Sequence, residues 1–309
     1  MKELSHCTLC PRQCGADRVA GARGFCGAGA EPKVFRWGPH FGEEPPISGT
    51  RGSGTVFFSH CPLGCLYCQN HPWTAGGAGR RMTTAELADV LAELAAQGCH
   101  NWNLVTPEPW LPLVREAAEI ARAKGASLPF VSNTSGYAST AVAARYGDLS
   151  DIALVDLRYA SRRCALEASR APDYPEVARA YVSWCWENIG PLQTDERGVA
   201  VRGTIVRLLV LPGHADEAVE NLRWLRKACG REIALSLMSQ YTPAHAAKKT
   251  PGWDRTVTEE EFRLVTDEAE RLGLEEGWTQ PWGTATGDDG LLGANMRPGE
   301  GRVGEPGNT

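Results

Sequence analysis

The stretch Cys61-Pro-Leu-Gly-Cys65-Leu-Tyr-Cys68 carries three cysteines at the spacing C-x3-C-x2-C. It directly follows Thr55-Val-Phe-Phe-Ser59, an apolar run typical of a buried strand. Three thiolates on one loop can bind three irons of a [4Fe-4S] cluster and leave the fourth iron open to another ligand. Zinc is the alternative, but structural zinc sites use four protein ligands, often as two C-x2-C pairs. The loop therefore favours an iron–sulfur centre with one open iron.

A second group of cysteines lies near the N-terminus: Cys7, Cys10, Cys14 and Cys26, separated by two, three and eleven residues. Five glycines between positions 15 and 29 allow the backbone to fold tightly around a bound group. Four thiolates saturate either a tetrahedral zinc ion or a [4Fe-4S] cluster. We favour an auxiliary [4Fe-4S] cluster because the same chain already indicates one iron–sulfur site, and a zinc knuckle remains the alternative.

Composition narrows the class of protein. The chain has 309 residues, 42% of them hydrophobic, which is enough to bury a substantial core. It has no run of about 18 apolar residues, so we expect no membrane span, and its polar N-terminus is unlike a signal peptide. The net charge of −5 argues against a nucleic-acid polymer as partner. Eleven cysteines, seven of them in two tight groups, suggest metal binding in a reducing cytoplasm.

Hydrophobic patterning predicts alternating strands and helices from residue 55 onward. Strands are expected at 55–59, 102–106, 128–132, 152–156, 203–211 and 233–238, and helices at 83–97, 110–124, 139–146, 175–189, 215–229 and 258–272. Two of these helices begin with capping boxes, Thr83-x-x-Glu86 and Thr258-x-x-Glu261. Six β-α units predict an α/β fold with a parallel sheet, and six are too few to close an eight-stranded barrel.

The cysteine loop and several further stretches resemble the radical S-adenosylmethionine (SAM) superfamily. More closely, the chain resembles the uncharacterised homologues of pyruvate formate-lyase activating enzyme. The matching stretches include CTLCPRQCGADRVAGARGFCGAG (7–29), FGEEPPISGTRGSGTVFFSHCPLGCLYCQN (41–70), NLVTPEP (103–109), NTSGY (133–137), APDYPEVA (171–178), RLLVLPG (207–213) and SLMSQYTP (236–243). The resemblance implies a partial (β/α)6 barrel over residues 55–281. Residues 1–54 would then form a cysteine-rich metal-binding extension and connector, and the glycine-rich residues 282–309 a flexible tail or lid.

The resemblance also implies a chemistry. A [4Fe-4S] cluster on Cys61, Cys65 and Cys68 would bind SAM and cleave it reductively to a 5′-deoxyadenosyl radical that abstracts a hydrogen atom. Such an enzyme needs an electron donor such as flavodoxin or ferredoxin. The turn Thr106-Pro-Glu108-Pro is similar to the Gly-Gly-Glu-Pro-like turn that binds the SAM ammonium group, whereas the close homologues have Thr-Pro-Thr-His there. A surface carboxylate is the alternative for Glu108.

Other candidate site residues follow the expected strands, because ligands bind at the C-terminal edge of a parallel sheet. The cofactor-binding candidates are Tyr67, Glu108, Asn133, Asp156, Arg207 and Gln240, and the substrate candidates are His60, Arg158 and Tyr159. Arg158 stands where the relatives have lysine, and Leu208 where they have histidine. With Arg162 and Arg163, Arg158 would suit a phosphate or carboxylate.

Three functions are compatible with these features. The first is a radical SAM enzyme acting on a small molecule such as a nucleotide or sugar phosphate, with the auxiliary cluster as substrate ligand, electron carrier or sulfur donor in a sulfur insertion. The second is an activating enzyme that installs a glycyl radical on a partner protein. The third is a non-catalytic iron–sulfur or zinc scaffold.

Overall fold

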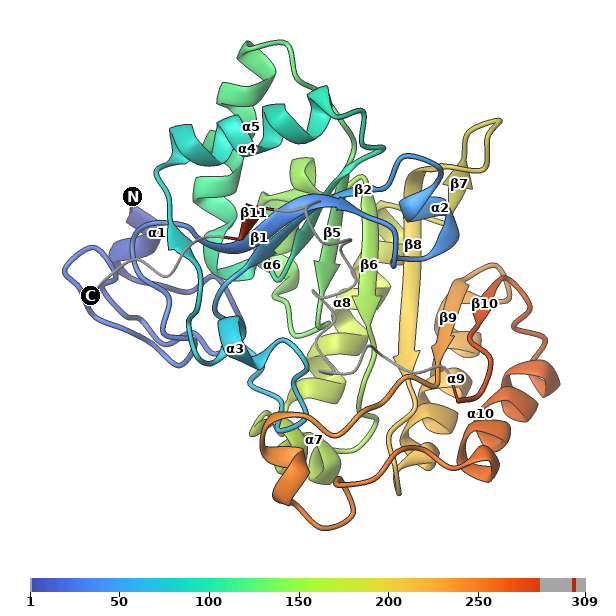
Figure 1. Cartoon of the computed structure of the whole chain (residues 1–309). Coiled ribbons are helices and arrows are strands. Elements are labelled where there is room, and N and C mark those ends of the chain that lie inside the picture. Colours follow the sequence, from blue (N-terminus) through green and yellow to red (C-terminus); the bar gives the residue numbers. More distant parts are fainter. Residues whose placement is uncertain (1, 284–301, 304–309) are drawn as a thin grey trace.

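The computed structural model describes residues 2–283 and 302–303, and these form an α/β fold around one large sheet (Figure 1). Its strands lie in the order β10-β9-β8-β6-β5-β4-β2-β1-β11, with β3 paired to β1 and β7 to β8. The strands are β1 (Lys33–His40), β2 (Ser53–Phe58), β3 (Arg80–Arg81), β4 (Trp102–Val105), β5 (Phe130–Thr134), β6 (Ile152–Asp156), β7 (Gln193–Thr194), β8 (Ala200–Leu209), β9 (Ala234–Met238), β10 (Gly277–Thr279) and β11 (Arg302–Val303).

The six strands expected from the sequence are all present and form the parallel part of the sheet. Strands β2, β4, β5, β6, β8 and β9 pair in parallel in the order of the chain, and β10 extends this block. Right-handed crossovers in one direction put the long helices that follow these strands on the same face of the sheet, whereas Trp73 of the short helix α3 (His71–Thr74) packs against Phe57 and Val105 on the other face. Strands β1, β3, β7, β10 and β11 were not predicted, because they are short or lie in polar segments without alternation.

The six expected helices are all present near their predicted ranges, and four further helices were not predicted. The helices are α1 (Lys2–Ser5), α2 (Pro45–Ser48), α3 (His71–Thr74), α4 (Thr84–Ala96), α5 (Leu111–Ala123), α6 (Thr140–Arg145), α7 (Arg162–Ser169), α8 (Tyr174–Asn188), α9 (Ala215–Cys229) and α10 (Glu259–Arg271), with 3-10 turns η1 (Glu108–Trp110), η2 (Gly147–Leu149) and η3 (His245–Lys249). Those not predicted are α1, α2, α3 and α7. Both predicted capping boxes are present. Sequence patterning missed α7 because its buried side chains, Cys164, Ala165 and Ala168, are small.

The connector at residues 41–52 covers the face of the sheet opposite the helices. Alternate residues of a strand point to opposite faces, and in β5 Phe130 packs toward α4 and α5 while Val131 packs with Ile47 of α2. The sequence assigned this segment to the connector. It contributes buried apolar and acidic side chains to the inner face, including Ile47 and Glu44.

The predicted boundary between the extension and the sheet also differs from the structure. Strand β1 and the first residues of β2 lie before residue 55, so the sheet begins within the segment assigned to the extension. Most of the predicted tail or lid lies outside the described residues. In the part of the chain that the structure describes, no helix is long and apolar enough to cross a membrane.

Gly136, just after β5, provides a test of this strand arrangement. Its φ is +77°, and a Cβ there would lie 2.3 Å from the Asp156 carbonyl oxygen. We expect Gly136→Ala to lower the free energy of unfolding by roughly 3 kcal/mol, since it adds a backbone clash to the cost of a positive φ. Gly190→Ala is the matched control, because Gly190 has φ +92° but no atom within 4 Å of the added Cβ. If urea unfolding showed the same loss of unfolding free energy in both variants, the close approach of the backbone at Gly136 to β6 would be contradicted.

Candidate active site

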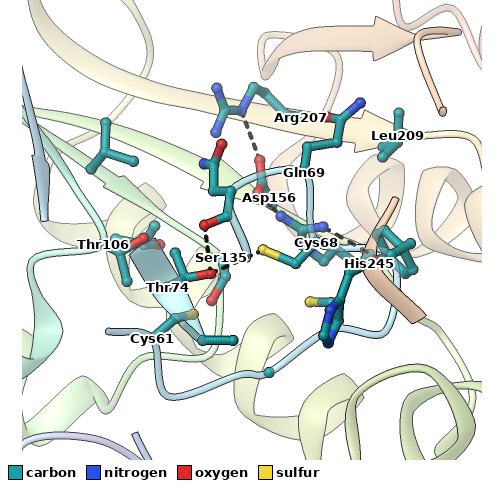
Figure 2. Close-up of a pocket in the computed structure, with 18 of the residues that line it drawn as sticks. Cys61, Cys68, Gln69, Thr74, Thr106, Ser135, Asp156, Arg207, Leu209 and His245 are labelled. Atoms are coloured by element: carbon teal, nitrogen blue, oxygen red, sulfur yellow. Dashed lines mark hydrogen bonds and ion pairs between the residues drawn. The ribbon is translucent and has the colours of Figure 1, made fainter. Parts of the chain in front are cut away.

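A cavity of about 200 Å3, partly open to solvent, lies at the C-terminal ends of the parallel strands. Figure 2 shows Cys61, Cys68, Asp156, Arg207 and His245 arranged around it. Nine of the predicted site residues line it: Cys61, Cys65, Tyr67, Cys68, Asn133, Asp156, Arg158, Arg207 and Gln240. They come from the loop after β2 and from the ends of β5, β6, β8 and β9. The position agrees with the general rule for parallel sheets.

The loop after β2 places polar groups at hydrogen-bond distance from two of its cysteine sulfurs. The backbone N–H of Leu63 donates to Cys61 Sγ at 3.4 Å, and Thr74 Oγ1, which donates to the Asn70 carbonyl oxygen, lies 3.2 Å from Cys68 Sγ. A donor such as the Leu63 N–H stabilises a thiolate and orients it as a ligand. Gly64 turns the loop with φ +75°. Cys61 and Cys68 are therefore held by polar contacts within the loop.

The thiols are also electrostatically coupled. Burial, followed by the charges of Cys65, Cys68 and Glu108, raises the pKa of Cys61 well above its usual value. Burial and then Cys65 raise the pKa of Cys68 to about 11. The thiolate forms of these cysteines repel one another. A bound cationic metal group would offset this repulsion and stabilise the thiolates, which is why metal ligation deprotonates thiols.

The described residues contain no preformed site for a single metal ion. Over residues 2–283 and 302–303, no three His, Cys, Asp or Glu side chains are placed to hold one metal ion. In a [4Fe-4S] cluster each thiolate binds a different iron, so the ligands surround a volume instead of a point.

A buried ionic network forms the floor of the cavity beneath the cysteines. Glu43 accepts hydrogen bonds from the Nδ2 atoms of Asn103 (3.0 Å) and Asn133 (3.1 Å) and from Arg207 Nη1 (3.2 Å). Arg207 also donates to Asn133 Oδ1 and to Asp156 Oδ1, both at 2.7 Å, and Arg158 donates to Asp156 Oδ2 at 2.6 Å. The network thus joins the connector to β4, β5, β6 and β8.

The charges in this network balance. Burial disfavours ionised Asp156, but Arg207 and Arg158 outweigh it and hold the Asp156 pKa below its usual range. Burial raises the pKa of Glu44, which favours its neutral form, although Arg207 works in the opposite direction. Within the ion pairs themselves, the carboxylates of Glu43 and Asp156 face the guanidinium groups of Arg158 and Arg207.

Glu43→Gln tests this network. The amide would place an N–H₂ group against donors from Arg207 or from Asn103 and Asn133, and would leave a buried positive charge uncompensated. We expect a loss of about 3 kcal/mol in the free energy of unfolding. Glu176→Gln is the control, because the Glu176–Arg162 pair is more than half exposed on both sides and should contribute less than about 1 kcal/mol. Urea unfolding measures the loss of unfolding free energy in both variants. If Glu43→Gln lost no more than the control, a role of Glu43 in compensating buried positive charge would be contradicted.

Glu108 lies away from the other predicted cofactor residues. It is 3% exposed and lines a second, smaller cavity together with Ser132 and Tyr181. Neither carboxylate oxygen has a hydrogen-bond partner among the described residues. Burial, and to a lesser degree the charge of Asp156, raises the pKa of Glu108 to about 8. The structure therefore shows no surface carboxylate here, and it does not bring Glu108 into the cavity of the three cysteines.

The raised pKa of Glu108 predicts a pH dependence of stability. A carboxyl group whose pKa is higher in the folded state stabilises the protein below its unfolded pKa, and this contribution disappears as pH rises through the folded pKa. Between about pH 5 and about pH 9, the wild type should lose roughly 3 kcal/mol more than Glu108→Gln. Urea unfolding at both pH values measures this difference. Glu176→Gln should lose as much unfolding free energy between these pH values as the wild type does. If Glu108→Gln also lost as much as the wild type, the raised pKa of Glu108 would be contradicted.

The three substrate candidates differ in their positions. Arg158 lines the cavity, but its charge is paired with Asp156, and Arg162 pairs with Glu176 on the surface, so the predicted arginine site for an anion is not assembled. Tyr159 is buried behind the cavity, with its hydroxyl 2.8 Å from that of Tyr67. His60 Nδ1 lies 3.0 Å from the Cys26 carbonyl oxygen, which places it beside the N-terminal segment.

Tyr67, predicted to lie near adenine, anchors the cysteine loop. Its ring stacks on Trp253 with centroids 5.5 Å apart and planes 7° apart, and it also packs against Tyr241 at 5.5 Å. Gln240 lines the cavity and accepts a hydrogen bond from Gln280 Nε2 at 3.2 Å.

The N-terminal cysteines lie close enough to influence one another. Burial raises the pKa of Cys10 to about 12, and the charges of Cys26 and Cys7 contribute. Burial also raises the pKa of Cys26, with contributions from Cys7 and Cys14. A Cβ on Gly24 would lie 2.3 Å from Cys14 Sγ, so only glycine fits there. The four thiols therefore gather in one region of the fold.

Several cavity residues were not identified from the sequence. Thr74, Arg170 and His245 come from separate segments that carry no motif. The His245 ring stacks on His71 with centroids 5.0 Å apart, and burial, followed by the charge of His71, lowers the His245 pKa. Thr106 also lines the cavity with a φ of +59°, which is unusual for a β-branched residue and marks a strained turn at the site.

Comparison with known proteins leaves the function to be argued from the site. No protein-family model matches the chain. The chain is 24% identical over 282 residues to uncharacterized protein MJ0674 of Methanocaldococcus jannaschii, covering 88% of this chain and 76% of that protein. The crystal structure of Streptococcus suis SuiB is similar with a TM-score of 0.44 and 11% identity over 72% of this chain. The chain spans 47% of that SuiB chain.

Proposed function

We propose that this protein is a radical SAM enzyme, with a [4Fe-4S] cluster held by Cys61, Cys65 and Cys68. The observation that carries the proposal is that these three electrostatically coupled thiols, one buried and two half-buried, line a cavity at the strand ends together with Asn133, Asp156 and Arg207. When bound, the reduced cluster supplies the electron that cleaves SAM to a radical able to take a hydrogen atom from a substrate. Three cysteine ligands leave one iron open for SAM.

The chain's own residues would position SAM and exclude water. The rigid floor of Asp156, Arg207 and Asn133 offers oxygen and nitrogen atoms to the ribose and carboxylate of SAM, and its balanced charge keeps it ordered in the absence of ligand. Glu108 is buried without a partner, as a residue reserved for an ammonium group would be. Its place in the second cavity means that this role requires its side chain to turn toward Thr106.

The cavity at the strand ends is a concave site, partly open to solvent, with convergent polar groups from several strands, as small-molecule sites commonly are. We propose a small molecule as substrate. A nucleotide or sugar phosphate would need a cationic group other than Arg158, which is already paired. Arg170, at the exposed rim of the cavity, is the available cationic group.

We further propose that Cys7, Cys10, Cys14 and Cys26 hold an auxiliary [4Fe-4S] cluster. Their mutual coupling and the hydrogen bond from Arg18 Nη1 to Cys7 Sγ at 3.7 Å suit an anionic cluster. A role as sulfur donor belongs to this site, since sulfide from such a cluster can enter a product. Zinc would occupy the same four thiolates.

Metal analysis after anaerobic reconstitution tests both assignments. The wild type should contain about eight irons per chain, and the triple variant Cys61→Ala/Cys65→Ala/Cys68→Ala about four. With dithionite and SAM, the wild type should release 5′-deoxyadenosine and the triple variant none. Cys229→Ala, which removes an isolated buried thiol, should retain full iron and activity. Zinc in place of iron, or no 5′-deoxyadenosine from the iron-loaded wild type, would overturn the proposed function.

A further inference from the structure

An exposed aromatic side chain, flanked by two arginines, covers the outer side of the cysteine loop. Phe25 is 41% exposed, with Arg12 Cζ 3.8 Å and Arg170 Cζ 5.3 Å from its ring centroid. The ring also meets the loop itself, because a Cβ on Gly64 would lie 3.2 Å from two of its atoms. Gly64 immediately precedes Cys65, so the side chains of Phe25, Arg12 and Arg170 lie directly over the proposed cluster loop. We call these three side chains the Phe25 patch.

The Phe25 patch is held rigidly. Arg12 donates to the carbonyl oxygens of Pro62 (3.1 Å) and Leu63 (3.2 Å) in the cysteine loop. It also donates to those of Ser169 (3.1 Å) and Arg170 (2.7 Å) at the end of α7. All four acceptors are backbone atoms, so the guanidinium keeps its full positive charge while its position is fixed. A preorganised surface loses less entropy when it binds a partner.

The patch is basic although the chain as a whole is acidic. Its surface cations, Arg12 and Arg170, belong to a chain whose net charge is −5. Within the described residues, neither Arg12 nor Arg170 has a carboxylate partner.

Helix α7 extends this surface. Its exposed side includes Arg163 and Leu166, one turn apart, and Leu166 is 55% exposed. The helix ends at Arg170, and the N–H of Leu66 in the cysteine loop donates to the Ala168 carbonyl at 2.8 Å. Aromatic and arginine side chains with nearby exposed apolar groups are the residues that dominate protein–protein interfaces.

We infer that the Phe25 patch is the docking surface for an acidic one-electron carrier protein of the flavodoxin or ferredoxin class. The inference rests on the proposed function and adds where its electron enters. A compact basic patch suits a small, transient contact that attracts an acidic partner by charge. In the encounter one electron passes to the oxidised cluster, so the carrier is oxidised by one electron and the cluster reduced by one, with no bond made or broken.

Binding of oxidised flavodoxin, measured by calorimetry, tests the surface directly. The affinity of the full-length protein should fall as NaCl rises, because exposed charges are screened by salt. Arg170→Glu should weaken binding roughly tenfold and Phe25→Ala roughly fivefold. Arg263→Glu makes the same charge change on exposed α10, at the far end of the sheet from the N-terminal segment (Figure 1), and should alter binding less than about twofold. Equal effects of Arg170→Glu and Arg263→Glu would overturn the inference.

Reduction kinetics separate this inference from the proposed function. In the reconstituted protein, Phe25→Ala should slow bleaching of the cluster by photoreduced flavodoxin roughly fivefold, while bleaching by dithionite stays within about twofold of wild type. A matched iron content and melting temperature exclude misfolding as the cause. Equal slowing with both reductants would overturn the docking surface. Failure of dithionite to bleach the wild type would contradict the proposed function. The comparison of flavodoxin binding by Arg170→Glu and Arg263→Glu would still show whether the Phe25 patch is a docking surface.

Discussion

The Arg207 guanidinium is the interaction on which the site depends. It contacts Glu43 from the connector, Asn133 from β5 and Asp156 from β6, and so holds three segments around one planar group. Arginine suits this position because its donors are fixed in a fork and it stays charged when buried. Buried ion pairs add little net stability, since their desolvation is costly. The network's main effect is therefore to set the strand ends in one arrangement.

Two arginines within the cysteine-rich segment fix its position against the sheet. Arg12 joins it to the cysteine loop, and Arg18 donates to the carbonyl oxygens of Gly29 at 2.8 Å and Pro109 at 2.6 Å, the latter just before α5. The Arg18 guanidinium also lies over the Trp110 ring at 4.9 Å. The N-terminal cysteines are thus held beside the β4–α5 turn, where Glu108 is buried between the two cysteine groups and influences the pKa of both Cys10 and Cys61.

The strained turn at Thr106 belongs to the same region. A β-branched residue with positive φ is costly and persists only where the surroundings force it. Its N–H donates to the Asn133 carbonyl at 2.9 Å, and Pro107 follows it directly. The strain falls at the edge of the cavity and between the two candidate ligand sites, where a ligand's contacts could change the turn.

The sequence by itself determined the parallel β-α units, both cysteine groups and most of the polar residues at the strand ends. These features are local: periodicity, capping residues and cysteine spacing act over a few neighbouring residues. Tertiary structure alone decided that Asp156 neutralises Arg158, that Glu108 faces a second cavity, that His60 turns toward Cys26 and that Arg170 and His245 join the site. Which charges become partners depends on how separate strands are brought together, and that distance information is absent from the order of residues along the chain.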